Sequence, residues 1–247
     1  MGGYNINACD WSGILRNLLY KKLVSKILTH SKNLNFSIWA CEPGMEKKWG
    51  CDIDIYIERN VNDFILFAFQ AKILKLGQFY ADLDKFSKGS YQYQKLENYG
   101  VFKKCHTNYL LYNGVSGFYH NGNNKCSSPF SEDQFGLSYV SIDDIKSVIK
   151  TKANWTFQYF HPTIASPLSE LVCCRNNNSL NIKSYDYKEI SQTLDEYQQL
   201  IFEDDINQYF EKAIGEDSDK NEDDISKDVS ERKPEIVIVL RNTTSTY

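Results

Sequence analysis

Four polar residues in the first third of the chain have types and an order that suit a metal-dependent hydrolytic site. Asp52 opens a segment in which apolar and polar residues alternate, whereas Gln70 and Lys72 close the apolar segment that follows. Residues two apart on a strand point to the same face, so Gln70 and Lys72 share a face. If the two segments pair as antiparallel strands, the start of the first lies beside the end of the second. The sheet edge then gathers Asp52, Gln70 and Lys72, and Glu46 reaches it from the preceding loop.

Carboxylates beside an ammonium group can support chemistry at phosphorus. Mg²⁺ prefers one or two carboxylates, with water and phosphate oxygens completing its octahedral shell. A metal ion held in this way lowers the pKa of a bound water and stabilises the charge of an in-line displacement. Lys72 could orient or deprotonate that water and neutralise the phosphate. Taken alone, a lysine at a strand end is more often a residue of the sheet rim, and the combination of residues is what favours a site.

The hydropathy pattern predicts the elements that must position these residues. Strict alternation over 52–58 predicts a half-buried strand, and the almost wholly apolar run over 64–72 predicts a central strand buried on both faces. Residues 60–63 supply the turn between the two strands. The other elements predicted in this half are an amphipathic helix of about 18–20 residues after Asp10, a strand at 36–40, a helix at 91–100 and a strand at 108–113.

This order of helix, three strands, helix and strand, with an acid at one strand start and a lysine at the next strand end, resembles the PD-(D/E)xK (restriction-endonuclease-like) nuclease superfamily. The nearer resemblance is to a bacterial group with the pattern Glu, Gly-x-Asp, strand, Gln-Ala-Lys. Here these motifs are Glu46, Gly50-Cys51-Asp52 and Gln70-Ala71-Lys72. The resemblance covers about residues 10–115, with weaker similarity to residue 174, and implies an α/β (α+β) fold with a mixed sheet and an α-β-β-β-α-β core flanked by helices.

The resemblance also implies a role for each motif residue. Asp52 is the metal-ligand aspartate, Gln70 fills the (D/E) place and lends a further oxygen ligand, Lys72 is the motif lysine, and Glu46 is the accessory acid and a third ligand. The implied activity is a Mg²⁺- or Mn²⁺-dependent endonuclease that hydrolyses phosphodiester bonds in nucleic acid, with DNA favoured over RNA. Many relatives serve in restriction or antiphage defence, so we expect such a role here.

Two positions depart from the pattern of the superfamily. The (D/E) place holds Gln70, a variant of relatives similar to the Mrr enzymes. The accessory acid usually lies on the first helix, yet residues 11–41 contain neither Asp nor Glu, so Glu46 or Glu42 must replace it from a loop. With so few carboxylates, one metal ion is favoured over two.

Several neighbouring side chains are candidates for contact with a substrate. Asp54 shares a strand face with Asp52 and competes with it as a metal ligand. Lys75, Tyr93 and Gln94 follow the motif lysine in the chain and are further candidates. Aromatic side chains close to a helix more often pack in the core than face a substrate.

The second half of the chain predicts a mainly helical extension over 116–214 and then a late strand over 234–241. Between them, residues 215–233 are acidic and poor in apolar residues, which predicts a disordered linker that acts as a solvated tether or as a mimic of DNA. An apolar strand after such a linker should return to an edge of the sheet. No boundary divides the chain, so one domain over 1–247 is expected. The helices predicted here lie at 141–150, from Pro167 to Cys174 and at 186–214.

Composition limits the class of protein. The chain has 247 residues, of which 42% are hydrophobic and 24% charged, as in ordinary globular proteins. No apolar run is long enough for a membrane helix, and the N-terminal residues do not form a signal peptide. The seven cysteines contain no C-x-x-C pair, which favours reduced thiols in a cytoplasmic protein without a structural zinc site.

Charge is distributed unevenly along the chain. The formal net charge is −4, but residues 203–232 hold 12 acidic and four basic side chains, so the remainder is net positive and could hold a polyanion. We expect nucleic acid as partner, with a regulatory protein or a second copy of the chain as further partners, and no membrane. The alternative function is a catalytically inactive nuclease-like fold that binds nucleic acid or a protein partner in a defence complex.

Overall fold

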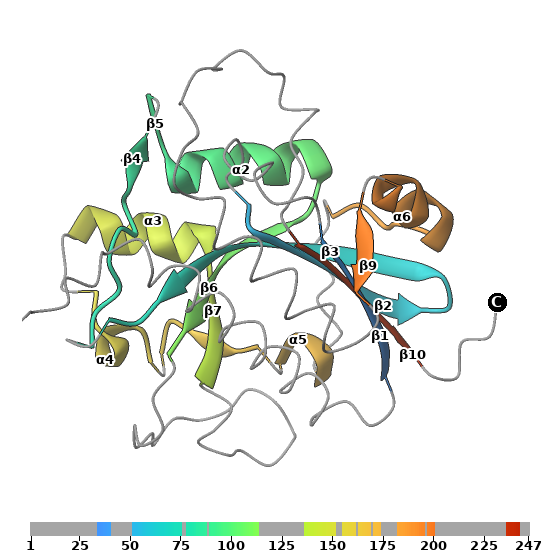
Figure 1. Cartoon of the computed structure of the whole chain (residues 1–247). Coiled ribbons are helices and arrows are strands. Elements are labelled where there is room, and N and C mark those ends of the chain that lie inside the picture. The colour runs from blue at the N-terminus through green and yellow to red at the C-terminus, as the bar shows by residue number, and fades with distance from the viewer. Residues whose placement is uncertain are drawn as a thin grey trace, which may run out of the picture.

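A mixed β-sheet of eight strands carries helices on both faces (Figure 1). This arrangement is the mixed α/β (α+β) class that the sequence predicts. The computed structural model describes residues 34–40, 51–75, 78–87, 89–113, 136–151, 155–161, 163–168, 170–173, 182–195, 197–200 and 236–242.

The strands of the sheet lie in the order β8-β7-β6-β3-β2-β10-β1-β9, and β4 and β5 form a separate two-stranded hairpin. The strands are β1 (Leu34–Ala40), β2 (Ile53–Asn60), β3 (Asp63–Ile73), β4 (Phe86–Ser87), β5 (Ser90–Tyr91), β6 (His106–Tyr112), β7 (Leu137–Ser141), β8 (Ser166–Pro167), β9 (Gln198–Leu200) and β10 (Ile236–Asn242). The helices are α2 (Gln92–Lys103), α3 (Ile142–Thr151), α4 (Phe157–Phe160), α5 (Glu170–Cys173) and α6 (Tyr187–Leu194).

The β2–β3 hairpin forms where the sequence predicts it. The two strands pair antiparallel, with Ile53 opposite Phe69 and Ile57 opposite Ile65. After β3 the chain passes through α2 and returns as β6, which pairs parallel to β3. The prediction of a half-buried β2 is wrong, because α2, Tyr185 and α6 cover the face that carries the polar residues. Asp54 and Glu58 on that face are 1% and 0% exposed.

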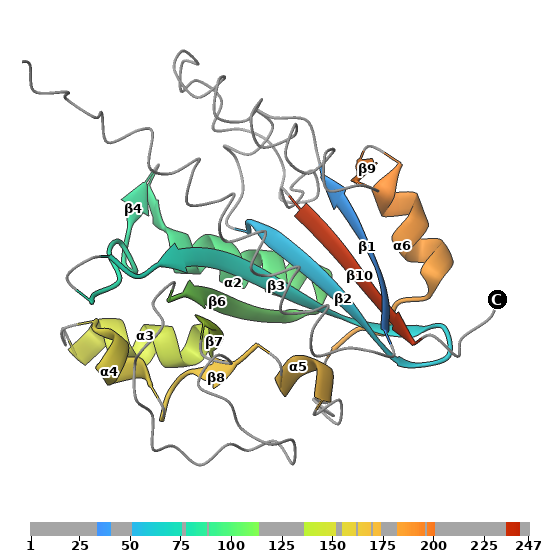
Figure 2. The same ribbon diagram turned by 60° about the horizontal axis from the view of Figure 1, so that its bottom comes forward.

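The late strand β10 does not lie at an edge, so that prediction is also wrong. β10 lies between β1 and β2, antiparallel to β1 and parallel to β2 (Figure 2). As a result β1, β2 and β3 do not form a continuous meander. The reason is the composition of the strand: residues 236–240 are all apolar and all buried, and such a run needs neighbours on both faces and along both edges.

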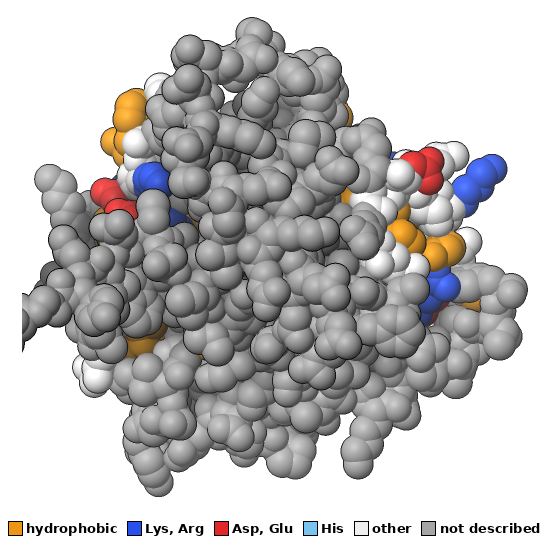
Figure 3. All heavy atoms as spheres, in the orientation of Figure 1, with side chains coloured by type: hydrophobic (Ala, Val, Ile, Leu, Met, Phe, Trp, Pro, Cys, Tyr) orange, Lys and Arg blue, Asp and Glu red, His pale blue; other side chains and the backbone are white. Residues whose placement is uncertain are grey.

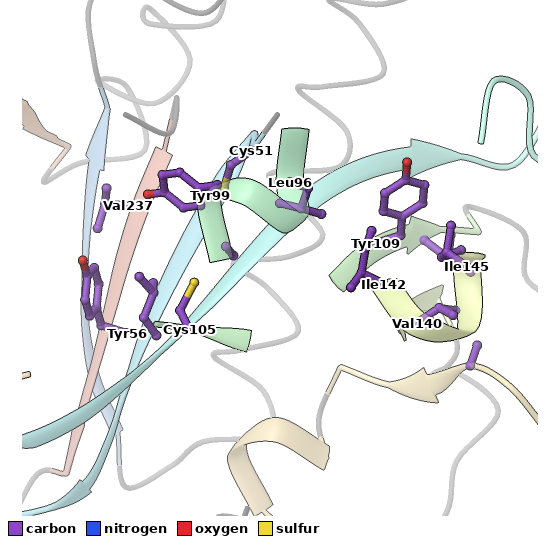
Figure 4. Close-up of a cluster of buried hydrophobic side chains, with 14 of the residues drawn as sticks. Cys51, Tyr56, Leu96, Tyr99, Cys105, Tyr109, Val140, Ile142, Ile145 and Val237 are labelled. Carbon is purple, nitrogen blue, oxygen red and sulfur yellow. The ribbon is translucent and has the colours of Figure 1, made fainter. Parts of the chain in front are cut away.

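Two apolar clusters fill the two sides of the sheet. The larger cluster lies under α2, α3 and α6 and includes Leu66, Leu96, Tyr99 and Tyr109, of which the last three are drawn in Figure 4. The smaller cluster lies on the opposite face, where Leu171 of α5 contributes. Helix α2 therefore packs directly over the hairpin that carries the motif residues.

The second half agrees with the sequence in part. Helix α3 begins where predicted, and the Ser141 side chain accepts from the Asp144 amide at 3.1 Å, as an N-cap does. The helix expected from Pro167 is instead the short strand β8 followed by α5. The long helix expected at 186–214 stops at Leu194, and β9 follows because it pairs with β1. The helix expected after Asp10 and the linker at 215–233 lie outside the described residues.

Candidate functional site

Asp52 and Gln70 meet at the point where β2 begins and β3 ends. The backbone amide of Asp52 donates to the Phe69 carbonyl at 2.8 Å, so the register of the hairpin extends to Asp52. Two donors from β3 converge on Asp52 Oδ2: the Gln70 side-chain amide, and the Ala71 backbone N–H at 2.7 Å. The structure thus brings together the predicted pair, with Asp52 partly exposed and Gln70 buried.

The amide oxygen of Gln70 is the unusual atom of this pair. Gln70 is 4% exposed, and its Oε1 is buried with no hydrogen-bond donor. Buried acceptors nearly always have a hydrogen-bond partner, so the Gln70 oxygen is suited to bind a further group. A cation is a suitable one, since an amide oxygen next to a carboxylate is a donor set that Mg²⁺ accepts. The chemistry of these two residues therefore fits the divalent ion that the sequence implies.

The third expected ligand, Glu46, lies outside the described residues. Within the part of the chain that the structure describes, no group of three or more His, Cys, Asp or Glu side chains could hold a metal ion. The described donor set is therefore Asp52 and the Gln70 oxygen.

Lys72 lies two residues beyond Gln70, on the same face of β3, and is 8% exposed. Its Nζ donates to the backbone carbonyl of Asp82 and to Gln92 Oε1, each at 2.6 Å, and lies 5.5 Å from the centroid of the Tyr109 ring. Burial lowers the pKa of Lys72 to about 8, although the nearby carboxylates, Asp52 foremost, act to raise it. The ammonium group can therefore exchange its proton close to neutral pH.

The loop that presents the Asp82 carbonyl is fixed by β6 and by the segment before α4. The Tyr109 hydroxyl donates to the Leu83 carbonyl at 3.1 Å, and the Tyr80 amide donates to the Trp155 carbonyl at 2.8 Å. Asp82 itself adopts the left-handed conformation with φ of 58°, which aspartate tolerates better than most residues. The acceptor of Lys72 is thus held from two sides.

A buried chain of polar groups anchors the same loop. Tyr80 donates to Asn113, and Asn113 Nδ2 donates to Ser138 Oγ at 3.2 Å. Ser138 Oγ in turn lies 2.7 Å from His161 Nε2, and His161 Nδ1 lies 2.9 Å from the Phe157 carbonyl. Although a serine beside a histidine can be a nucleophile, Ser138 is 0% exposed, so this pair joins elements of the fold rather than meeting a substrate.

Asp54 lies inside the core instead of beside Asp52 at the surface. Its carboxylate accepts from the Tyr99 hydroxyl at 2.6 Å and from Cys51 Sγ at 3.1 Å. Burial raises the pKa of Asp54 to about 6, against the effect of these two hydrogen bonds. The structure therefore gives Asp54 a place in the packing directly behind the site.

The remaining candidates for substrate contact lie around the site at different depths. Lys75 is exposed in the turn after β3. Gln94 is also exposed, and its side chain accepts from the Tyr91 amide at 3.0 Å, which stabilises the start of α2. Tyr93 is half-buried against the larger cluster. Sequence reasoning missed Gln92, the acceptor of Lys72, although the predicted helix start lies only one residue before it.

The fold and this site define a mixed α/β protein with an Asp–Gln–Lys cluster at the open end of a β-hairpin. The chain belongs to a family of unknown function (DUF6615), whose model matches residues 21–245. No curated protein and no solved structure matches the chain. None of the helices in the described residues is long and apolar enough to cross a membrane.

Proposed function

We propose that the protein is a metal-dependent nuclease of the PD-(D/E)xK type that hydrolyses phosphodiester bonds in nucleic acid, with DNA as the favoured substrate. The observation that carries the proposal is the convergence of three motif residues: Gln70 and Ala71 both donate to Asp52, and Lys72 follows on the same strand face. The resemblance in sequence also supports the proposal, because it requires these residue types on two paired strands.

Each residue has a distinct part in the proposed reaction. Asp52 and the Gln70 oxygen would hold Mg²⁺ or Mn²⁺, together with Glu46. When bound, the ion supplies positive charge and an activated water at the scissile phosphate. Lys72 donates to two oxygen acceptors, and a phosphate oxygen is an acceptor of the same kind. With a pKa of about 8, Lys72 can also hold or release a proton on the side of the phosphate that the water attacks.

The cellular setting is part of the same proposal. A nuclease of this type would act in the cytoplasm, in restriction or antiphage defence, and would need restraint by a regulatory protein or by self-association. The support for this setting is the resemblance to the bacterial nuclease group.

A cleavage assay with matched variants tests the activity. Plasmid DNA, linear DNA and single-stranded RNA are incubated with Mg²⁺, with Mn²⁺ or with EDTA. We expect Lys72→Met to lose roughly 100-fold or more in rate, as for loss of a general acid–base group. Asp52→Asn should also lose activity, because it removes a carboxylate ligand of the ion. Asp195→Asn, at the residue that follows α6, and Lys150→Met, in the last turn of α3, change exposed side chains and should keep the wild-type rate. Circular dichroism confirms that each variant is folded.

The second candidate function is binding of nucleic acid without cleavage. It is favoured by the fact that the protein's own groups already contact Asp52 and Lys72 in hydrogen bonds. Binding without any product in Mg²⁺, Mn²⁺ or Ca²⁺ would contradict hydrolysis and support this alternative. Equal cleavage by wild type and both site variants would instead show that the activity resides elsewhere.

A further inference from the structure

Three aromatic rings form a surface at the β4–β5 hairpin, directly before α2. This aromatic surface consists of Phe86, Tyr91 and Tyr93. Phe86 pairs with Tyr91 across the hairpin, and the two side chains are 60% and 36% exposed. Figure 3 shows hydrophobic side chains exposed where β4 and β5 project from the molecule. Exposed aromatic side chains of this size gathered at one place commonly mark a binding surface.

The rings are arranged in a short row. The centroids of Phe86 and Tyr91 are 5.0 Å apart with an angle of 71° between the planes, and those of Tyr91 and Tyr93 are 5.2 Å apart at 16°. The Tyr91–Tyr93 pair is therefore stacked, and Phe86 lies edge-on at the exposed end. A planar ligand could extend this row by stacking at its open end.

The row of rings is continuous with the proposed site. Gln92 lies between Tyr91 and Tyr93 in the chain, and its side chain accepts from Lys72 Nζ at 2.6 Å. The backbone amide of Gln92 also donates to the carbonyl of Lys85, the residue before β4, at 2.9 Å. A ligand on the rings therefore contacts the residues that flank Gln92 in the chain, and Gln92 accepts the hydrogen bond of Lys72.

The charged side chains around the rings carry no large excess of positive charge. Among the described residues, the exposed charged side chains of the neighbouring loops are Asp82, Asp84, Lys75 and Lys85, two acidic and two basic. The sequence adds Lys88 between β4 and β5. A protein that binds chiefly through the backbone of nucleic acid needs an excess of Lys and Arg. Stacking of bases on aromatic rings needs no such excess of Lys and Arg, but it requires bases whose faces are free. The bases of an intact duplex are stacked on one another.

We propose that the aromatic surface of Phe86, Tyr91 and Tyr93 stacks unpaired nucleobases of the strand whose backbone enters the Lys72 site. The substrate class is then single-stranded nucleic acid, or a duplex with an unpaired segment. This inference rests on the proposed nuclease function for the identity of the ligand. The evidence for it is the continuity between the rings and Lys72 through Gln92, together with the lack of a large positive excess around the rings.

A binding assay that does not depend on cleavage tests the inference. Fluorescence anisotropy is measured with a labelled single strand, the matching duplex, and a duplex with an internal loop, with Ca²⁺ in place of Mg²⁺. The wild type should bind the single strand and the looped duplex roughly tenfold more tightly than the intact duplex. Phe86→Ala with Tyr91→Ala should remove this preference, through a total loss of roughly tenfold in affinity for the single strand and the looped duplex. Phe102→Ala, at the other end of α2 and 48% exposed, is the matched control.

The outcomes separate the inference from the proposed function. Unchanged affinity of the hairpin variant for the single strand and the looped duplex would overturn the inference, even if Lys72→Met abolishes cleavage. A variant that alters sedimentation without altering nucleic-acid binding would overturn it in favour of a protein interface. If no protein cleaves but the hairpin variant loses single-strand binding, the nuclease proposal fails and the stacking surface stands.

Discussion

Burial shifts two ionisable side chains on the same face of the β2–β3 hairpin toward their neutral forms. Loss of hydration lowers the pKa of Lys72 to about 8 and raises the pKa of Asp54 to about 6. Each group keeps two polar partners, which is the usual condition for burying an ionisable group. Asp52 lies beside both of them along the hairpin. Groups with pKa values near neutrality at one place are typical of functional sites, which supports the candidate site.

The lowered pKa of Lys72 predicts how the free energy of unfolding depends on pH. The pKa of an unfolded lysine is 10.5, so between pH 8 and 10.5 the unfolded chain binds more protons than the folded chain. Stability contributed by Lys72 is therefore present above pH 10.5 and is lost as the pH falls through 8. Relative to Lys72→Met, the wild type should gain about 2 kcal/mol in unfolding free energy from pH 7 to pH 10.

Urea unfolding at a series of pH values measures this difference. Lys150→Met, in the last turn of α3 and exposed, should follow the wild type at every pH. A difference between wild type and Lys72→Met that stays constant with pH would mean that Lys72 keeps its ordinary pKa in the folded protein.

Sequence predicted the site in its local parts and missed its distant ones. Asp52, Gln70 and Lys72 lie together because a hairpin brings neighbours in sequence into contact, which the alternation and the turn already indicate. The burial of Asp54 was not predictable, because alternation shows only that two faces differ and not that a helix covers the polar one. The Asp82 carbonyl depends on a loop conformation that leaves no residue pattern.

At the scale of elements, the strands were easier to predict than their order. The runs at 36–40, 64–72 and 108–113 are mostly apolar, and each corresponds to a strand. The position of β10 depends on pairing with two strands far away in the chain, and local hydropathy does not encode partners. Its composition did carry a signal, since a fully apolar run favours an interior strand. The short strands β8 and β9 have no pattern of their own and exist through their pairing.

Helix α2 approaches β6 closely at one residue, and this contact yields a prediction. A Cβ at Gly100 would lie 2.3 Å from the Cγ2 of Thr107, which is closer than real contacts allow. Gly100→Ala should therefore cost about 1–3 kcal/mol in unfolding free energy through overpacking, despite the better helix propensity of alanine. Denaturant unfolding measures the loss.

A double variant identifies the cause of that loss. Thr107→Ser removes Cγ2 and leaves the hydroxyl, so Gly100→Ala with Thr107→Ser should recover most of the stability relative to Thr107→Ser alone. If the second change gives no recovery, the helix shifts for a reason other than this contact. Because α2 also carries Gln92, the cleavage rate of Gly100→Ala reports whether the spacing of α2 matters to Lys72.

At the scale of the whole molecule, the two ends of the described chain complete the sheet beside the candidate site. Strands β1 and β10 pair over seven residues, and β10 pairs on its other side with β2. The amide of Ile236, the first residue of β10, donates to the carbonyl of Asp52 at 3.2 Å. The backbone of the proposed metal ligand is thus held by β3 on one side and by β10 on the other.

Removal of β10 should therefore abolish both the fold and the activity. A chain that ends at Lys233 lacks the strand that pairs with β1 and β2, and it leaves empty the places that Ile238 and Val239 fill in the core. We expect the cost to exceed the roughly 5–15 kcal/mol of free energy by which folded proteins are stable. A chain that ends at Asn242, after β10, should unfold at the wild-type temperature. A synthetic peptide of residues 234–247 added to the shorter chain should restore near-ultraviolet circular dichroism and, with it, cleavage. Wild-type cleavage by the shorter chain alone would show that the β2–β3 hairpin positions Asp52 without β10.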